Sequence, residues 1–208
     1  MKPFVIKNPI FLTSAVKPKD YPLLKDSSGR PIPEIAVAGR SNVGKSSLLN
    51  HLFQSKGLVK TSSTPGKTQM LNFFGVDDGQ LVFVDLPGYG YAQVPLQVRK
   101  KWGPMVQDYL SQRETLKVVL CLFDIRRTPN EEDLQMMGWA VQAQKSVILV
   151  LTKVDKVSSN ERKANTQKIL QSFPYENLQY VHYSATKNIG RKELTGMLKE
   201  ALQEEMEQ

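Results

Sequence analysis

The chain has 208 residues, of which 40% are hydrophobic, and this size suits one well-filled α/β domain rather than two. Its 28 Lys and Arg residues outnumber 20 Asp and Glu residues, and the net charge of +8 favours an anionic partner such as RNA. A single cysteine excludes an internal disulfide, and no apolar run approaches the ~20 residues of a membrane helix. We therefore expect a cytoplasmic protein that does not insert into membranes.

Strand-like and helix-like segments alternate along the chain. Residues 1–33, with a strand at 11–15 and a proline-rich loop, form an N-terminal extension of a main domain at 34–208. Strands are then expected at 35–38, 70–76, 81–84, 118–123, 147–151 and 178–183. Helices are expected at 45–53, 95–112, 130–144, 159–172 and 192–205. This alternation predicts an α/β fold with a doubly wound, mostly parallel, six-stranded sheet and helices on both faces.

A Walker A pattern follows the strand at 35–38 and opens the next helix, which is the context that a phosphate-binding loop requires. Its residues are Gly39, Arg40, Ser41, Asn42, Val43, Gly44, Lys45 and Ser46. The glycines let the backbone approach phosphates closely, and successive amides point partial positive charge at them. We expect Lys45 to reach the β- and γ-phosphates and the Ser46 hydroxyl to bind Mg²⁺, as in P-loop NTPases.

A DxxG motif follows the strand at 81–84 and consists of Asp85, Leu86, Pro87 and Gly88. At this place a P-loop protein presents a carboxylate to its metal, and Asp85 is expected to act through a water because Mg²⁺ keeps much of its hydration. The amide of Gly88 is expected to approach the γ-phosphate, so that its peptide responds to hydrolysis.

Two further segments indicate the base. The motif Thr152, Lys153, Val154 and Asp155 closes the strand at 147–151, at the edge where open α/β sheets bind ligands. The Asp155 carboxylate can accept from N1–H and the 2-amino group of guanine, a donor pair that adenine lacks, while Lys153 lays its stem along the base. Backbone amides of Tyr183, Ser184 and Ala185 are expected to contact the guanine oxygen. The order of motifs predicts a GTPase that binds GTP and GDP.

The assembled motifs resemble the EngB family of bacterial ribosome-assembly GTPases, in the translation-factor-related P-loop class. The resemblance covers almost the whole chain. It rests on GRSNVGKSSLLN from Gly39, TSSTPGKTQMLNFF from Thr61, VDLPGYGYAQVP from Val84, KWGPMVQDYL from Lys101 and TKVDK from Thr152. It implies contact with the large ribosomal subunit or its RNA during assembly, and a role in cell division and septation. We expect a monomer.

The resemblance also implies a first switch at Gly66, Lys67, Thr68, Gln69 and Met70. The resemblance favours Thr68 as the second Mg²⁺ ligand, and Thr64 is the alternative. Either hydroxyl could bind the metal only in the triphosphate state. Lys45, Thr68 and Gly88 are accordingly the predicted catalytic residues.

The chain departs from the broader GTPase pattern at two positions. Thr152 stands where many relatives carry Asn, and Tyr89 follows Gly88 where many small GTPases carry the Gln that orients water. We therefore expect slow hydrolysis that is stimulated by a partner or by potassium bound near Asn42. The alternative for Asn42 is that its side chain forms hydrogen bonds only within its own loop. Trp102 either stacks on an RNA base or packs into the core.

Two rival functions are weighed against the GTPase. An ATP-dependent kinase would need an adenine site, and Asp155 argues against adenine. A nucleotide-binding scaffold that does not hydrolyse stays open, because Tyr89 removes the usual group that orients water.

Overall fold

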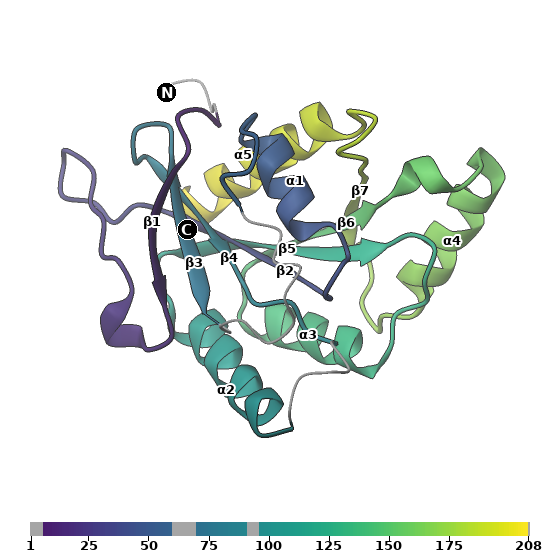
Figure 1. Ribbon diagram of the computed structural model, residues 1–208, viewed down its shortest axis with the longest axis horizontal. Coiled ribbons are helices and arrows are strands. Elements are labelled where there is room, and N and C mark those ends of the chain that lie inside the picture. The colour runs from purple at the N-terminus through teal and green to yellow at the C-terminus, as the bar shows by residue number, and fades with distance from the viewer. Residues whose placement is uncertain (1–5, 60–69, 91–95, 208) are drawn as a thin grey trace.

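The structure, a computed structural model, describes residues 6–59, 70–90 and 96–207, without the side chains of 96–101 and 205–207. A twisted sheet crosses the middle of the molecule (Figure 1), and within this part of the chain it has seven strands in the order β1-β3-β4-β2-β5-β6-β7. The strands are β1 (Ile10–Ala15), β2 (Glu34–Gly39), β3 (Leu71–Val76), β4 (Leu81–Asp85), β5 (Leu116–Asp124), β6 (Ser146–Thr152) and β7 (Gln179–His182).

The prediction of six strands was wrong by one. β1 does not stay outside the sheet but pairs antiparallel with β3, with Phe11 opposite Phe74 and Ala15 opposite Leu71. The physical reason is burial at the sheet edge. Ala15 is 3% exposed, and the Phe11 ring contacts the Phe74 ring edge-on at 5.7 Å. β3 and β4 are also antiparallel, whereas β2, β4, β5, β6 and β7 run parallel, so the doubly wound, mostly parallel sheet is confirmed.

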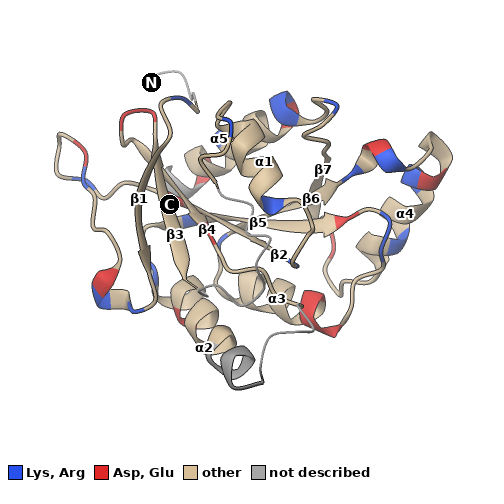
Figure 2. Ribbon diagram, viewed as in Figure 1, with Lys and Arg blue, Asp and Glu red and all other residues tan. Residues whose placement is uncertain are grey.

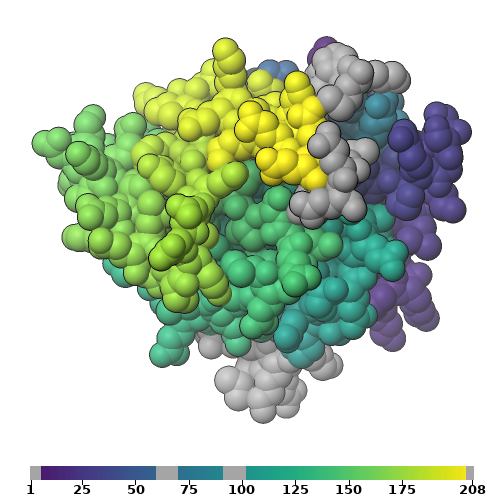
Figure 3. Space-filling view, turned by 180° about the vertical axis from the view of Figure 1, so that it is seen from behind, coloured from purple at the N-terminus to yellow at the C-terminus, as the bar shows by residue number. Residues whose placement is uncertain are grey.

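Helices cover both faces of the sheet (Figure 1). α1 (Lys45–Leu52) and α5 (Arg191–Glu207) pack on one face, and α2 (Leu96–Gln112), α3 (Glu131–Gln142) and α4 (Ser159–Gln171) pack on the other. Short 3₁₀ turns lie at η1 (Pro18–Asp20) and η2 (Val154–Lys156). From behind, α5 runs along the upper edge of the molecule beside the yellow-green segment that leads into it (Figure 3).

The central strands are apolar on both sides because both sides are covered. In β2, Ile35 and Val37 pack toward α1 and α5, whereas Ala36 and Ala38 pack toward α2 and α3. Cys121 of β5 is 1% exposed, and burial raises the pKa of its thiol to about 12. Among the described helices, each is too short or too polar to cross a bilayer.

Element boundaries follow the sequence patterns closely. Each predicted strand and helix starts and ends within two residues of the observed one. The parallel strands β2, β5, β6 and β7 all end at one edge of the sheet, and the loops that follow them gather there. Doubly wound sheets bind ligands at this edge, and the candidate site lies there.

Candidate nucleotide-binding site

The loop between β2 and α1 depends on two glycines. Gly44, directly before α1, has φ of 111°, a conformation that strains any residue with a Cβ. A Cβ on Gly39 would lie 2.8 Å from Val43 Cγ1 and 3.0 Å from Leu122 Cβ. The loop therefore keeps its shape only with glycine at both positions, and it directs its amides and the start of α1 toward one place.

Lys45 and Asp85 meet beside this loop. Lys45 is the first residue of α1 and Asp85 the last of β4, and the Lys45 Nζ contacts the Asp85 Oδ1 in an ion pair. The two side chains are only 11% and 10% exposed. β2 and β4 are parallel, with Val37 opposite Asp85, so sheet register brings the carboxylate to the phosphate loop. Ser46 follows Lys45 in the first turn of α1 and is partly exposed.

The DxxG segment lies directly against the phosphate loop. The Ser41 amide donates to the Tyr89 carbonyl oxygen at 2.8 Å, and the Ser41 hydroxyl donates to the Gly88 carbonyl oxygen at 3.4 Å. A Cβ on Gly88 would lie 3.1 Å from the Ser41 Oγ and 3.3 Å from its Cα. A larger residue here would push the two loops a few tenths of an ångström apart.

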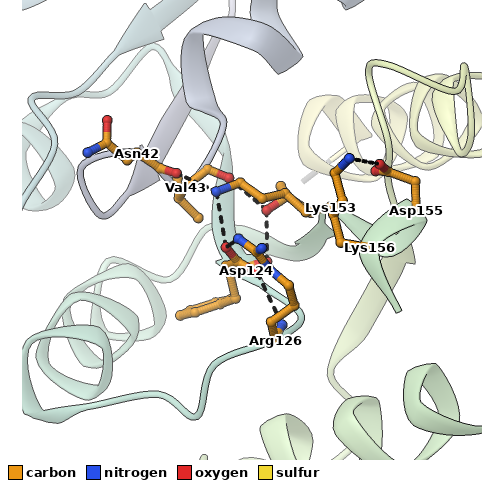
Figure 4. Close-up of polar contacts among 9 residues, drawn as sticks. Asn42, Val43, Asp124, Arg126, Lys153, Asp155 and Lys156 are labelled. Atoms are coloured by element: carbon orange, nitrogen blue, oxygen red, sulfur yellow. Dashed lines mark hydrogen bonds and ion pairs between the residues drawn. The ribbon is translucent and has the colours of Figure 1, made fainter. Parts of the chain in front are cut away.

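Thr152 and Lys153 connect the phosphate loop to the end of β5. The Thr152 hydroxyl is 2.8 Å from the Val43 carbonyl oxygen and 3.1 Å from that of Phe123, and it hydrogen-bonds to both. The Lys153 Nζ donates to the Asn42 carbonyl oxygen at 2.6 Å and pairs with Asp124 Oδ2 at 3.0 Å (Figure 4). Thr152 thus links the base loop to the phosphate loop through its hydroxyl.

Asp155 presents a buried acceptor. Its Oδ1 accepts from the Ser184 hydroxyl at 2.7 Å, and that bond, more than any other cause, lowers the pKa of Asp155. Its Oδ2 is buried without a hydrogen-bond partner among the described residues, although the Lys156 Nζ lies 3.3 Å away in an ion pair (Figure 4). The carboxylate is therefore ionised and has an oxygen left to accept from a ligand.

The segment at 183–185 contributes more than its backbone. Tyr183 is 1% exposed and its hydroxyl lies 2.6 Å from His51 Nδ1, while Ala185 is partly buried. Sequence reasoning assigned only backbone contacts here and missed the Ser184 hydroxyl, which orients Asp155. A serine next to an alanine carries no local signal for that role, because Asp155 lies 29 positions away.

Asp124 was also missed. It ends β5 and accepts from the Arg126 amide at 3.1 Å, from its Nε at 2.9 Å and from its Nη2 at 2.7 Å. Burial favours a raised pKa for Asp124, but the bonds from Arg126 and Lys153 outweigh it and lower the pKa to about 2. The available signal was a carboxylate at the carboxyl end of a parallel strand, the same placement as that of Asp85 and the Asp155 motif.

Tyr89 and Trp102 lie on the inner side of the DxxG segment. The Tyr89 ring is 5% exposed, and its hydroxyl donates to Asp133 Oδ1 at 2.9 Å. Trp102 packs between Tyr89 and Trp139 with ring centroids 5.5 and 5.8 Å away. Of the two expectations for Trp102, packing is the one observed: the ring is partly buried and packs against the core.

Most of the predicted first switch, including Thr68 and its alternative Thr64, lies outside the described residues. Met70 directly precedes β3 and is partly exposed. The second Mg²⁺ ligand therefore stays a prediction.

The fold and this set of loops together define a P-loop GTPase. A sequence model of the family described as "50S ribosome-binding GTPase" matches residues 34–153. The chain is 58% identical over 198 residues to the probable GTP-binding protein EngB of Protochlamydia amoebophila, covering 95% of this chain and 96% of that protein. It is 50% identical to the EngB protein of Trichlorobacter lovleyi, over 94% of this chain and 96% of that one. The chain belongs to the EngB family of GTPases.

Solved structures agree with this fold. The crystal structure of a probable GTP-binding protein EngB has a TM-score of 0.66 and 21% identity, covering 82% of this chain and 99% of that one. Aquifex aeolicus Era bound to GDP·AlF₄⁻ has a TM-score of 0.61 and 24% identity, covering 80% and 56% of the two chains.

Proposed function

We propose that the chain binds GTP and GDP at the loops that contain Gly44, Asp85, Asp155 and Ser184, and hydrolyses GTP slowly as a molecular switch acting on the large ribosomal subunit. The observation that carries the base assignment is the buried Oδ2 of Asp155, which has no hydrogen-bond partner among the described residues while Oδ1 is held by Ser184. Adenine offers no matching donor pair, so with adenine bound this oxygen would keep no hydrogen bond, which makes rejection of adenine strong.

The phosphates and the metal fit the other end of the loop set. The Lys45 ammonium and the Asp85 carboxylate already lie together, so a cation for phosphate oxygens and a carboxylate for a hydrated metal converge at one place. Ser46, with Thr68, would hold Mg²⁺. When bound, Mg²⁺ neutralises phosphate charge and orients the chain of phosphates. The amides after Gly44 and the amide of Gly88 donate to phosphate oxygens.

Calorimetry with GDP, GTP and ATP, each with Mg²⁺ and with EDTA, tests this assignment. We expect Mg²⁺-dependent binding of both guanine nucleotides and none of ATP. Lys45→Ala is expected to weaken triphosphate binding, and Ser46→Ala chiefly its dependence on Mg²⁺. Wild-type affinity and Mg²⁺ dependence in both variants would remove the phosphate loop from the site.

Potassium is proposed to assist hydrolysis. The Tyr89 hydroxyl is taken up by Asp133, so it does not replace the absent Gln. Asn42 is exposed, and its carboxamide points away from Lys153 (Figure 4) and bonds to no other described residue. Its oxygen is therefore available as a ligand for a cation that offsets charge on the phosphates. We expect faster turnover in potassium chloride than in sodium chloride at equal ionic strength, and no difference between the salts in Asn42→Ala.

The ribosomal partner is supported by the family and by charge. The family description names 50S binding, and the chain carries a net charge of +8. Lys and Arg positions occur on loops at several places on the molecule (Figure 2). Near the site, the exposed cations include Arg126, Arg127, Lys156 and Lys187, and such side chains bind RNA phosphates. Sedimentation with ribosomal subunits should show co-migration with the large subunit that depends on whether GTP, GDP or no nucleotide is present.

A cellular role in ribosome assembly, cell division and septation follows from the family resemblance. Depletion of the protein in cells should first cause large-subunit precursors to accumulate, with division defects appearing later. The scaffold reading is tested separately by measuring phosphate release at high enzyme concentration, where a slow GTPase still gives more than one turnover per molecule.

A further inference from the structure

We propose that Tyr89 is a positioning residue for this GTPase. Its buried hydroxyl, bonded to Asp133, fixes the Gly88 peptide against the phosphate loop and joins that peptide to α3 and α2. The inference rests on the proposed function, because it requires the Gly88 amide to contact the γ-phosphate.

The segment around Gly88 is attached on three sides. On the side of the phosphate loop, the Ser41 amide donates to the Tyr89 carbonyl oxygen at 2.8 Å. On the side of α3, the Tyr89 hydroxyl donates to Asp133 Oδ1 at 2.9 Å. On the side of α2, the Trp102 Nε1 donates to the Pro87 carbonyl oxygen at 3.2 Å. Gly88 lies between these attachments, so displacing its peptide strains at least one of them.

Asp133 joins three segments that are distant in sequence. The residue is 2% exposed, and its Oδ2 accepts from the Asn130 amide at 3.0 Å, which closes the capping box of α3. The same oxygen lies 3.7 Å from Nη1 of Arg40 in the phosphate loop. A carboxylate this deeply buried is stable only when its oxygens are paired. Tyr89 therefore binds to a fixed point rather than to a mobile side chain.

The direction of the Tyr89 side chain separates this role from water activation. Burial, together with the charge of Asp133, raises the pKa of Tyr89 well above its ordinary value, so the phenol remains a hydrogen-bond donor at any working pH. Its proton is directed at α3 and not at the edge of the sheet. Tyr89 thus affects the reaction through the backbone of Gly88, and not by contact with water or phosphate.

Tyr109 provides a matched control. It is also a buried tyrosine whose hydroxyl donates to a buried carboxylate, Glu34 Oε2, at 2.8 Å. Both carboxylates keep an arginine nearby when the hydroxyl is removed, Arg40 for Asp133 and Arg113 for Glu34. Glu34 begins β2 and Gly39 ends it, so Tyr109 lies toward the end of the sheet opposite the proposed site. Replacing either tyrosine by Phe keeps the ring and removes one buried hydrogen bond.

The experiment compares Tyr89→Phe and Tyr109→Phe with wild type. Each protein is titrated with Mg²⁺·GDP and with a Mg²⁺·GTP analogue that is not hydrolysed, and kcat and KM are measured with GTP. In Tyr89→Phe we expect the affinity for the analogue and kcat each to fall about tenfold, which is the effect of losing one hydrogen bond to a charged group. The affinity for GDP should stay within about twofold of wild type. The fluorescence difference of Trp102 between the two nucleotides, measured in a Trp139→Phe background, should shrink.

Tyr109→Phe should lower thermal stability as much as Tyr89→Phe does, while keeping the ratio of analogue to GDP affinity. The positioning role would be overturned if Tyr89→Phe kept the wild-type ratio of analogue to GDP affinity and the wild-type kcat, or if both variants changed these quantities equally. Either result would leave nucleotide binding by the wild-type protein unaffected as a conclusion. If wild type bound no guanine nucleotide, the proposed function and the positioning role would both fall. Asp133→Asn serves as the second variant if Tyr89→Phe does not fold, and an unchanged affinity ratio in it would likewise contradict the inference.

Discussion

Each carboxylate around the site is held by donors that fix its direction. Lys45 contacts Asp85, Arg126 and Lys153 hold Asp124, and Ser184 holds Asp155. Such charge-assisted bonds are stronger than neutral ones, and in a buried setting they decide which oxygen is left for a ligand. Consequences of single substitutions can therefore be derived from the partners of each carboxylate.

Asp155→Asn tests base recognition. The amide replaces one acceptor with a donor, so guanine loses a bond and meets a repulsive contact, whereas xanthine, which has an oxygen at that position, gains a partner. We expect at least tenfold weaker GDP binding and relaxed discrimination against xanthine nucleotides, since each lost hydrogen bond to a charged group is worth about 1.5–3 kcal/mol. Calorimetry with GDP and XDP decides it. An unchanged preference for guanine would remove Asp155 from the base site.

Asp124 makes the stability of the protein depend on acid pH. The folded pKa of Asp124 is about 2, below the ordinary aspartate value of 3.8. Its contribution is thus fully present above the unfolded pKa and is lost as pH falls through the folded one. We expect Asp124→Asn to lower the free energy of unfolding by about 2 kcal/mol at pH 7, with the difference from wild type narrowing below pH 4. Urea unfolding at several pH values measures it, and Asp108→Asn, exposed on α2, serves as the control.

At the scale of elements, α3 and α4 begin where the site loops end, and side chains fix both starts. Asn130 and Asp133 form a capping box for α3, and Ser158 and Glu161 form one for α4. These caps satisfy amides that a helix start leaves unpaired. They also set where the loops after β5 and β6 end, and so the place of Asp124 and Asp155.

Ser158→Ala tests the cap of α4. The Ser158 hydroxyl accepts from the Glu161 amide at 3.3 Å and donates to Glu161 Oε2 at 2.7 Å, and the substitution removes both bonds. We expect the free energy of unfolding to fall by about 1 kcal/mol, with GDP affinity unchanged. Ser159→Ala, one residue further along and inside the helix, should change stability by less than about 0.5 kcal/mol. Equal losses in the two variants would contradict the capping role.

At the scale of the whole molecule, the two histidines join segments that are far apart in the chain. The ring of His51 on α1 contacts the Tyr183 hydroxyl and the Asn188 side chain, and His182 Nε2 lies 2.8 Å from the Thr166 hydroxyl of α4. Burial is the main cause that lowers the pKa of both histidines. Both are therefore neutral in the folded protein near pH 7, with bonds that suit neutral rings.

These histidines should make the fold less stable in mild acid. Their folded pKa values lie below the unfolded value of about 6.5, so the unfolded chain takes up more protons, and stability is lost as pH falls below that value. We expect thermal unfolding temperature to drop between pH 7.5 and pH 5.5 in wild type, and to drop less in the double variant His51→Gln, His182→Gln. Equal drops would assign the pH dependence to other groups.

The fold class, the position of nearly every element and the order of the GTPase motifs could all be predicted from the amino-acid sequence. These depend on local patterns: apolar runs for buried strands, glycines in the predicted phosphate loop, and the carboxylates Asp85 and Asp155 at or just beyond strand ends. The EngB family could also be predicted from the sequence, because each of its motifs is a run of consecutive residues. Thr68 stays a sequence prediction.

The contacts between residues that are distant in the chain became visible only in the folded molecule. In the described sheet, β1 is an additional edge strand that brings the number of strands to seven. Asp124 forms an ion pair with Lys153, the Ser184 hydroxyl donates to Asp155, and the buried Tyr89 hydroxyl donates to Asp133. Tyr89 and Asp133 are 44 positions apart, and Ser184 and Asp155 are 29 apart. Such pairs depend on sheet register and helix packing, which bring chain segments together without leaving a pattern in either segment alone.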